Sequence, residues 1–252
     1  KMKNSLNKIF IERYARQIVL KNIGVIGQKK IINAKVLVIG AGGLGCPVTE
    51  YLARAGVGKI GIIDSDKVSL SNIHRQSMYN TEDVGKYKVF VVKNKLSKIN
   101  PYSKIEIFKS RLKINNVEKL IKKFDIIVDG SDNFKTKLLL NEKCLKFKKI
   151  FIAASISKFD GHIFTFDFKY KKTPCLKCFY QTKPSDEILN CEAEGILGSV
   201  AGVVGNIQAC EVLKKITNIG NDLTGKILII NLLDLNFRKI NFSKKKKCLC
   251  NI

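Results

Sequence analysis

Residues 35–64, KVLVIGAGGLGCPVTEYLARAGVGKIGIID, decide the fold class of this chain. The segment 35–39 is a short, β-branched apolar run, which is typical of a buried strand. A glycine-rich turn follows at 40–45, then a segment at helical spacing (48–55) and a second buried strand at 59–63. This strand–turn–helix–strand order predicts two parallel strands joined by a right-handed crossover.

The alternation of helical and strand patterns continues beyond residue 64. The sequence predicts helices at 88–99, 117–122 and 136–146, and strands at 104–108, 124–128 and 150–154. The helix predicted at 88–99 ends at Asn100-Pro101, because proline disfavours helical backbone in the residue before it. We therefore expect an α/β fold with a doubly wound, mainly parallel, Rossmann-like sheet.

The pattern changes after about residue 160. Apolar runs at 161–168, 226–232 and 235–242 are joined by short turns, which favours antiparallel pairing. A long helix rich in small residues is expected at 198–216. We treat 1–252 as one domain, with a helical segment at 1–33 and an antiparallel extension at 160–252 that carries a cysteine knot.

The glycine turn indicates a nucleotide site. Gly40, Gly42, Gly43 and Gly45 fit the G-x-G-x-x-G pattern between a strand and a helix. Glycines let the backbone approach phosphate oxygens, and the N-terminus of the following helix offers unpaired N–H groups. Asp64, at the end of the next strand, can accept hydrogen bonds from ribose hydroxyls. Alone, this pattern would favour a nicotinamide dinucleotide.

Polar residues that follow the next strands favour ATP instead. The run from Asp64 to Gln76 includes Asp66, Asn72 and Arg75 and leaves a buried strand at the sheet edge where ligands bind. Lys88 opens the following predicted helix and adds a cation. Asp132 follows another strand at the same edge, where a carboxylate beside phosphates can hold Mg²⁺. Nucleotidyl transfer needs such cations and a metal-binding acid, whereas hydride transfer does not.

The bulk charge does not indicate nucleic-acid binding. The formal net charge is +25, but only six of the 46 basic residues are arginine, and the lysines are spread along the chain. Specific nucleic-acid surfaces use arginine for bidentate contacts. We interpret the lysines as a compositional bias that fills solvated faces, although it could also attract acidic partners. No stretch approaches the roughly 18 apolar residues of a membrane span, and we expect a soluble protein of the cytoplasm, stroma or matrix.

The eight cysteines favour metal or thiol chemistry over disulfides, since we find no secretion signal. Cys175-x-x-Cys178 and Cys248-x-Cys250 together have the form of a four-cysteine zinc site. The second pair is one residue short of Cys-x-x-Cys, so two free thiols in a frayed tail are the alternative. A further three cysteines lie among apolar neighbours and are expected in the core: Cys46, Cys144 and Cys210.

These motifs together resemble the sulfur-carrier adenylyltransferases, the MoeB/ThiF family, which are relatives of the ubiquitin-activating enzymes. The resemblance extends from about Glu12 to the C-terminus, and residues 68–76 are its most specific stretch. The matching motifs are Arg13-Tyr-x-Arg16-Gln, Gly40–Gly45, Asp64–Gln76, Gly85-x-x-Lys88, Ser131-Asp132-Asn133 and the cysteine pairs.

The resemblance implies that the protein uses ATP and Mg²⁺ to adenylate the C-terminal glycine of a ubiquitin-like sulfur carrier that ends in Gly-Gly. Asp64 matches the ribose-binding acid, Asp132 the magnesium and catalytic aspartate. Phosphate ligands are matched by Asn72, Arg75 and Lys88. Arg16 matches an arginine that reaches the neighbouring subunit's active site, which implies a homodimer; from its position alone, a surface salt bridge was the simpler interpretation.

Cys191 matches a position that in some family members links covalently to the carrier. A nearby helix N-terminus would lower the pKa of this thiol, whereas Glu192 and Glu194 oppose that effect. We expect a separate sulfurtransferase or cysteine desulfurase to supply sulfur, because little sequence follows the last cysteine pair. Two alternatives stay open: a nicotinamide-dependent oxidoreductase and an inactive relative that binds partners.

Overall fold

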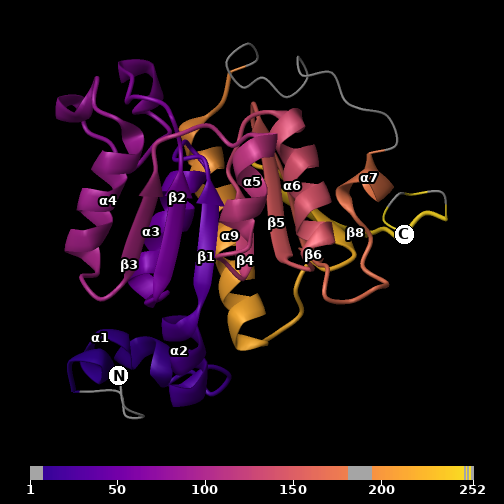
Figure 1. Ribbon diagram of the computed structural model, residues 1–252, viewed down its shortest axis with the longest axis horizontal. Coiled ribbons are helices and arrows are strands. Elements are labelled where there is room, and N and C mark those ends of the chain that lie inside the picture. The colour runs from indigo at the N-terminus through magenta and orange to yellow at the C-terminus, as the bar shows by residue number, and fades with distance from the viewer. Residues whose placement is uncertain (1–7, 181–194, 247, 249, 251–252) are drawn as a thin grey trace.

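A computed structural model describes residues 8–180, 195–246, 248 and 250. Within these ranges the strands form one eight-stranded sheet in the order β3-β2-β1-β4-β5-β6-β7-β8 (Figure 1). The first five strands are parallel, and β6 to β8 are antiparallel to their neighbours. Their bounds are β1 (Lys35–Ile39), β2 (Lys59–Ile63), β3 (Lys104–Phe108), β4 (Ile126–Asp129), β5 (Ile150–Ser157), β6 (Asp160–Asp167), β7 (Lys226–Asn231) and β8 (Asn236–Asn241).

Helices cover both faces of the parallel part of the sheet, which makes three layers. One face carries α3 (Gly45–Ala55), α4 (Lys88–Ile99) and α9 (Gly198–Thr217); the other carries α5 (Ile114–Ile121) and α6 (Phe134–Lys146). In β1, Val36 and Val38 pack under the first set, whereas Leu37 and Ile39 pack under the second. This alternation explains why β1 is apolar at every position but its first.

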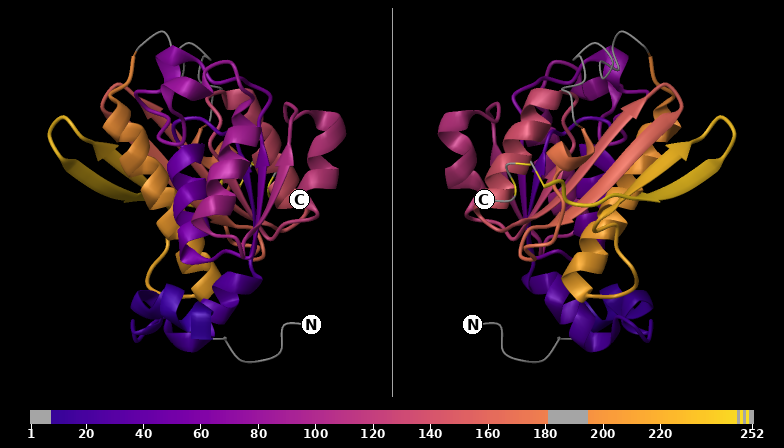
Figure 2. Two further views of the ribbon diagram at one scale, coloured as in Figure 1. Left: turned by 90° about the vertical axis from the view of Figure 1, so that its left-hand side faces the viewer. Right: turned by 90° about the vertical axis from the view of Figure 1, so that its right-hand side faces the viewer.

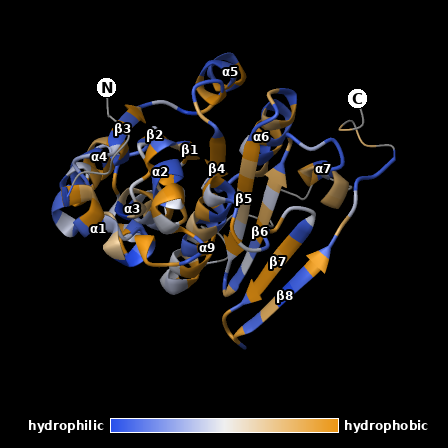
Figure 3. Cartoon of the chain, turned by 90° about the horizontal axis from the view of Figure 1, so that it is seen from below, coloured by the Kyte–Doolittle hydropathy of each residue, from blue (hydrophilic) through white to orange (hydrophobic). Residues whose placement is uncertain are grey.

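Hydropathy follows the same layers. Figure 3 shows hydrophobic colour prevailing in β4 and β7, whereas helices such as α6 carry both colours. The short helix α7 (Leu176–Phe179) and the described residues after β8 pack against the apolar core that lies under α5 and α6. The hairpin of β7 and β8 projects from the body of the molecule (Figure 2). Of the helices in the described part of the chain, none is both long and apolar enough to cross a membrane.

The predicted fold class is confirmed: a mainly parallel, doubly wound sheet with antiparallel strands after it. The predicted bounds of the helix at 88–99 and of the strands at 35–39, 59–63 and 104–108 are those observed. The helix expected at 117–122 begins earlier, at Ile114, because Asn116 Oδ1 accepts the Lys113 backbone N–H at 2.9 Å and stabilises an additional first turn. The division into one domain stays a prediction.

One expected core residue is wrong. Cys46 and Cys144 are buried, but Cys210 is exposed on α9. Its neighbours Ala209 and Val212 face the core. Position 210 points away from them, because consecutive helical residues are about 100° apart around the axis. A run of small apolar residues does not show which side of the helix faces solvent.

The two N-terminal helices dock below the amino ends of the strands. α1 (Lys8–Ile18) and α2 (Gly24–Asn33) precede β1, and Figure 1 shows them at the end of the sheet opposite the strand tips. Asn100, fully buried after α4, holds this arrangement. Its Nδ2 donates to Tyr14 Oη of α1 at 2.8 Å and to the Ala53 carbonyl of α3 at 2.7 Å.

We predict that Asn100→Leu lowers the free energy of unfolding by about 2–4 kcal/mol, because it removes two buried hydrogen bonds and leaves the Tyr14 hydroxyl without this donor. Tyr14→Phe removes one of the same bonds by deleting the hydroxyl, and should cost only about 1 kcal/mol. Urea unfolding of the two variants beside the parent protein measures both values. A loss for Asn100→Leu no larger than that for Tyr14→Phe would contradict this role of Asn100.

Candidate functional site

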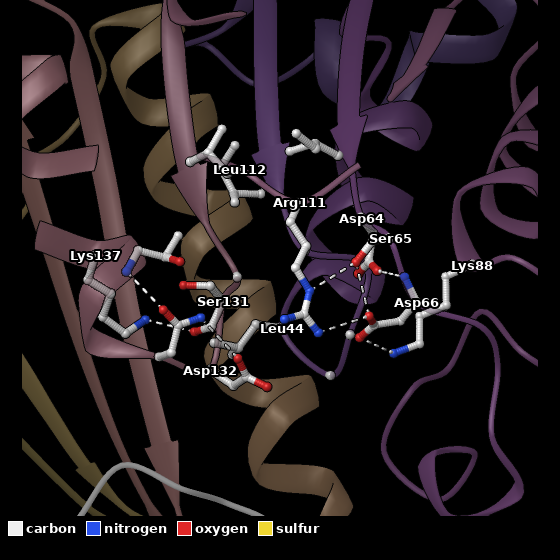
Figure 4. Close-up of a pocket in the computed structure, with 18 of the residues that line it drawn as sticks. Leu44, Asp64, Ser65, Asp66, Lys88, Arg111, Leu112, Ser131, Asp132 and Lys137 are labelled. Carbon is white, nitrogen blue, oxygen red and sulfur yellow. Dashed lines mark hydrogen bonds and ion pairs between the residues drawn. The ribbon is translucent and has the colours of Figure 1, made fainter. Parts of the chain in front are cut away.

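A cleft of about 940 Å³ opens at the carboxyl ends of the parallel strands. Its walls come from the segments that follow β1, β2, β3 and β4, together with the end of β5. Parallel strands deliver all these segments to one edge of the sheet. Figure 4 shows side chains from several of these segments facing one another across the cleft.

The glycine loop at the base of the cleft is tightly packed. Gly40 adopts a φ of +90°, which disfavours other residues. A Cβ on Gly45 would lie 2.0 Å from the Gly40 carbonyl oxygen, so only glycine fits there. At Gly42, by contrast, a Cβ would meet no described atom nearer than 3.7 Å and would project toward the cleft. A ligand can therefore approach this half-buried backbone without meeting a side chain.

Asp64 braces the glycine loop and faces the cleft. Its Oδ2 accepts a hydrogen bond from the Ala41 N–H at 2.7 Å, and its Oδ1 accepts one from the Asp66 N–H at 2.7 Å. Burial raises the pKa of Asp64 above its ordinary value, although these two N–H donors oppose the rise. Each carboxylate oxygen keeps a further lone pair, so the group can still accept hydrogen bonds from a ligand.

Two cations converge on Asp66 beside this acid. The Lys88 Nζ lies 3.8 Å from Asp66 Oδ2, and the Lys88 side chain is buried at the start of α4. Arg111, which follows β3, places Nη2 4.0 Å from Asp66 Oδ1 and donates from Nε to Ser65 Oγ at 3.3 Å (Figure 4). We did not predict Arg111. The available signal was its position after β3, at the same sheet edge as Asp64.

The turn that follows β2 carries the remaining predicted polar groups. Gln76 is buried and donates from Nε2 to Asn72 Oδ1 at 2.6 Å. Among the described residues, Gln76 Oε1 has no hydrogen-bond partner. Arg75 donates from Nη1 to the Ser71 carbonyl at 3.0 Å, which leaves most of its guanidinium N–H groups available in the cleft.

The segment that follows β4 brings Asp132 to the opposite wall. Asp132 is exposed, and Asn133 next to it caps α6 by accepting the Thr136 N–H at 2.9 Å. Behind this loop, Lys137 forms a buried ion pair with Asp129 at 2.8 Å. We missed Lys137 too. Its spacing from Leu140, Asn141 and Cys144, all buried, would have placed it on the inner face of α6.

The cleft is electropositive. Among the described residues that line it, six side chains are cationic and three are carboxylates. The cations are Arg75, Lys88, Arg111, Lys113, Lys135 and Lys137; the acids are Asp64, Asp66 and Asp132. An excess of cations around one carboxylate on the far wall suits a polyanion with a bound divalent metal ion. The donor chemistry of Asp132 therefore fits Mg²⁺.

One predicted site residue in the described part of the chain, Arg16, is not brought to the cleft. Arg16 is exposed on α1, at the other end of the sheet, so within one chain it cannot reach a ligand bound there. Its expected role in a second subunit's site is untested by a single chain. Cys191 lies outside the described residues.

The cysteine pairs do meet, away from the cleft. The Sγ atoms of Cys175, Cys178, Cys248 and Cys250 all lie within 4.8 Å of one another. Cys175 is 3.5 Å from Cys248, and Cys178 is 3.4 Å from Cys250. Tetrahedral zinc with 2.3 Å bonds holds its sulfurs roughly 3.8 Å apart, so the set fits zinc. Burial, with the adjacent thiols, raises the pKa of Cys175 to about 11, a rise that a bound cation would reverse.

Comparison with known proteins places this geometry in context. The model of the ThiF family matches residues 14–252. A probable molybdopterin-synthase adenylyltransferase of Gracilaria tenuistipitata is 39% identical over 96% of this chain and 68% of its own. A sulfur carrier protein adenylyltransferase of Thermus thermophilus is 36% identical over 94% of this chain and 89% of its own. The crystal structure of E. coli MccB with ATP superposes with a TM-score of 0.83 at 25% identity, covering 95% of this chain and 74% of that one.

The raised pKa of Asp64 generates a prediction about stability. A folded-state pKa above the unfolded value means that stability is lost as pH rises from about 3.8 through the folded pKa. Asp64→Asn removes this loss, so its stability relative to the parent protein should increase over that range. Urea unfolding of both proteins at several pH values measures the difference. A constant difference, or one that falls with pH, would show that the native fold does not disfavour the ionised acid.

Proposed function

The chain belongs to the ThiF family, and we propose that it uses ATP to adenylate the C-terminal carboxylate of a ubiquitin-like sulfur-carrier protein. The names of its relatives support this reaction. The observation that carries the proposal is the composition of the cleft: a glycine loop and Asp64 on one side, Asp132 on the other, and cationic side chains that line the same space. Its volume lies near the upper end of small-molecule sites, as a nucleotide plus a protein terminus would need.

Each wall has a role in holding the nucleotide. The backbone at Gly42 approaches the phosphates, aided by the N-terminus of α3. Asp64 accepts hydrogen bonds from the ribose hydroxyls. Lys88 and Arg75 neutralise phosphate oxygens. When bound at Asp132, Mg²⁺ would screen the charge of the phosphates.

The chemical step is an in-line displacement at the α-phosphorus. A carboxylate oxygen of the carrier forms the new bond to phosphorus, and the bond to the bridging oxygen of the β-phosphate breaks, so that pyrophosphate leaves with the electron pair. Arg75 and Lys88 stabilise the charge that develops on the leaving group. No general base is required, because the carrier carboxylate is already ionised at neutral pH.

The projecting hairpin lies within reach of the cleft. Ile156 lines the cleft and pairs with Gly161, which pairs with Ile230, which pairs with Phe237. Phe237 is exposed on the projecting hairpin. Three strand spacings separate the ends of this row, or about 14 Å. About four extended residues span that distance, so a carrier resting on Phe237 could reach the cleft with its C-terminal tail.

A second copy of the chain is the proposed source of a further cation. Arg16 lies far from the cleft of its own chain. Exposed apolar side chains lie on the same helix and on α2, among them Ile9, Ile11 and Ile26. We propose that a homodimer covers this surface and delivers Arg16 to the partner's phosphates. Sulfur then reaches the adenylated carrier from a separate sulfurtransferase or cysteine desulfurase.

The alternatives explain less of the cleft. A nicotinamide-dependent oxidoreductase would use Gly42 and Asp64 but would give Lys88 and Asp132 no role. An inactive relative would not need the described nucleotide-contacting groups, yet the structure gathers them around one cleft.

We predict that Asp132→Ala lowers the rate of carrier-dependent ATP–pyrophosphate exchange by at least about 100-fold, because the metal-binding acid is lost. Asp125→Ala is the matched control, since Asp125 is also exposed but precedes β4 at the opposite end of the sheet. It should leave exchange unchanged. The exchange assay uses candidate carriers that end in Gly-Gly. Full activity of Asp132→Ala would refute the assignment.

We also predict about one zinc ion per chain, held by the four thiolates. Removing it with a chelator should lower the melting temperature, because the metal ties the C-terminal segment to α7. Cys250→Ser should lose the metal, whereas Cys210→Ser, at an exposed cysteine outside the cluster, should keep it. Metal analysis and thermal unfolding test both statements. Purified protein with well under one zinc per chain would rule the site out.

A further inference from the structure

Lys137 is a buried lysine that takes no part in the proposed chemical step. Its side chain lies on the inner face of α6, with 4% of the residue exposed. The Nζ atom donates to three oxygens: Asp129 Oδ2 at 2.8 Å, the Ser131 carbonyl at 2.8 Å and the Ala154 carbonyl at 2.6 Å. An ammonium group has three N–H donors. All three are therefore occupied within the protein, and Lys137 cannot bind a ligand without breaking one of them.

The three acceptors lie on different elements. Asp129 is the last residue of β4, Ser131 belongs to the loop that carries Asp132, and Ala154 belongs to β5. The other carboxylate oxygen of Asp129 accepts the Ser131 N–H at 2.9 Å and its hydroxyl at 2.6 Å. Lys137 and Asp129 thus fix the loop on both sides of residue 131, and Figure 4 shows Lys137 reaching Ser131.

The start of the same loop is held from two more directions. Gln208 of α9 donates from Nε2 to the Asp129 carbonyl at 2.9 Å, and the Gly130 N–H donates to the Ile39 carbonyl at 2.8 Å. Asp132 itself is held far less. Among the described residues, its side chain makes one hydrogen bond, which Asn133 Nδ2 donates to Oδ1 at 3.3 Å. The carboxylate therefore takes its position from the backbone that Lys137 anchors.

We propose that Lys137 is a positioning residue that sets the place of Asp132 toward the metal–nucleotide complex. The proposal rests on the proposed function, because it gives Asp132 the metal-binding role. A buried ion pair contributes little net stability against an apolar pair of similar size. Lys137 connects the loop to β4 and β5, and the placement of Asp132 explains this connection better than a gain in stability does.

The test compares variants that keep the fold. Lys137→Met alone would leave the Asp129 charge buried and unpaired, which is strongly destabilising. The double variant Asp129→Asn/Lys137→Met removes both charges at similar volume. Lys143→Met is the matched control: the same change on the same helix, at a lysine paired with Glu118 and Glu142 and away from the loop. Lys137→Gln, which keeps two N–H donors, serves if the double variant does not fold.

Calorimetry measures ATP affinity with and without Mg²⁺, in the absence of carrier, alongside thermal unfolding. We expect the double variant to bind metal-free ATP like the parent protein but to lose about tenfold or more of the tightening by Mg²⁺. Lys137→Gln should lose part of it, and Lys143→Met none. In ATP–pyrophosphate exchange the double variant should lose kcat while its KM for the carrier stays unchanged.

The proposal would be overturned if Mg²⁺ increased the ATP affinity of the double variant as much as that of the parent protein. The same result for Lys137→Gln would overturn it if that variant is used instead. So would an equal loss in Lys143→Met, since the effect would then belong to the helix as a whole. A parent protein whose ATP affinity does not respond to Mg²⁺ would overturn it as well. A parent protein that binds ATP with Mg²⁺ but catalyses no exchange would instead defeat the proposed function and leave the role of Lys137 in place.

Discussion

The close backbone contact between the glycine loop and the loop that follows β4 is the constraint on which the cleft depends. A Cβ on Gly40 would lie 2.8 Å from the Gly130 carbonyl oxygen, and one on Gly45 would lie 2.0 Å from that of Gly40. Because neither glycine carries a side chain, α3 begins directly beside β4. The N-terminus of α3 and Asp132, in the loop that follows β4, therefore face the same space, as nucleotide chemistry requires.

The charges around this space are arranged in advance of any ligand. Asp66 lies near both Lys88 and Arg111, so the cations are held in place by a carboxylate that a polyanion can supplement. Asp64 is kept partly desolvated, which disfavours its own ionised form but leaves it ready to accept ribose hydroxyls. Such preorganisation costs some stability and reduces the reorganisation needed when substrate binds.

The sequence allowed the frame of the molecule to be predicted better than its supports. Short apolar strands such as β1 and the glycine turn carry strong local patterns, and they are found where expected. Lys137 was missed because a lysine in a lysine-rich chain looks solvated until its helix face is known. Arg111 was missed because its one signal, a position just after β3, points to the cleft only once β3 is placed beside β2 in the sheet. Cys210 was misplaced for the same reason of helix face. The roles of Arg16 and Cys191 stay predictions, since one depends on a second chain and the other lies outside the described residues.

The central claim is that this cleft, although built on a dinucleotide-style glycine loop, is made for ATP and a divalent metal ion. Equilibrium binding by calorimetry tests it most directly, with ATP and NAD compared in the same buffer containing Mg²⁺. The arrangement of Arg75, Lys88 and Asp132 predicts that ATP binds and that its affinity falls when Mg²⁺ is removed, while NAD binds weakly or not at all. Tight NAD binding with no response to ATP and Mg²⁺ would contradict the account.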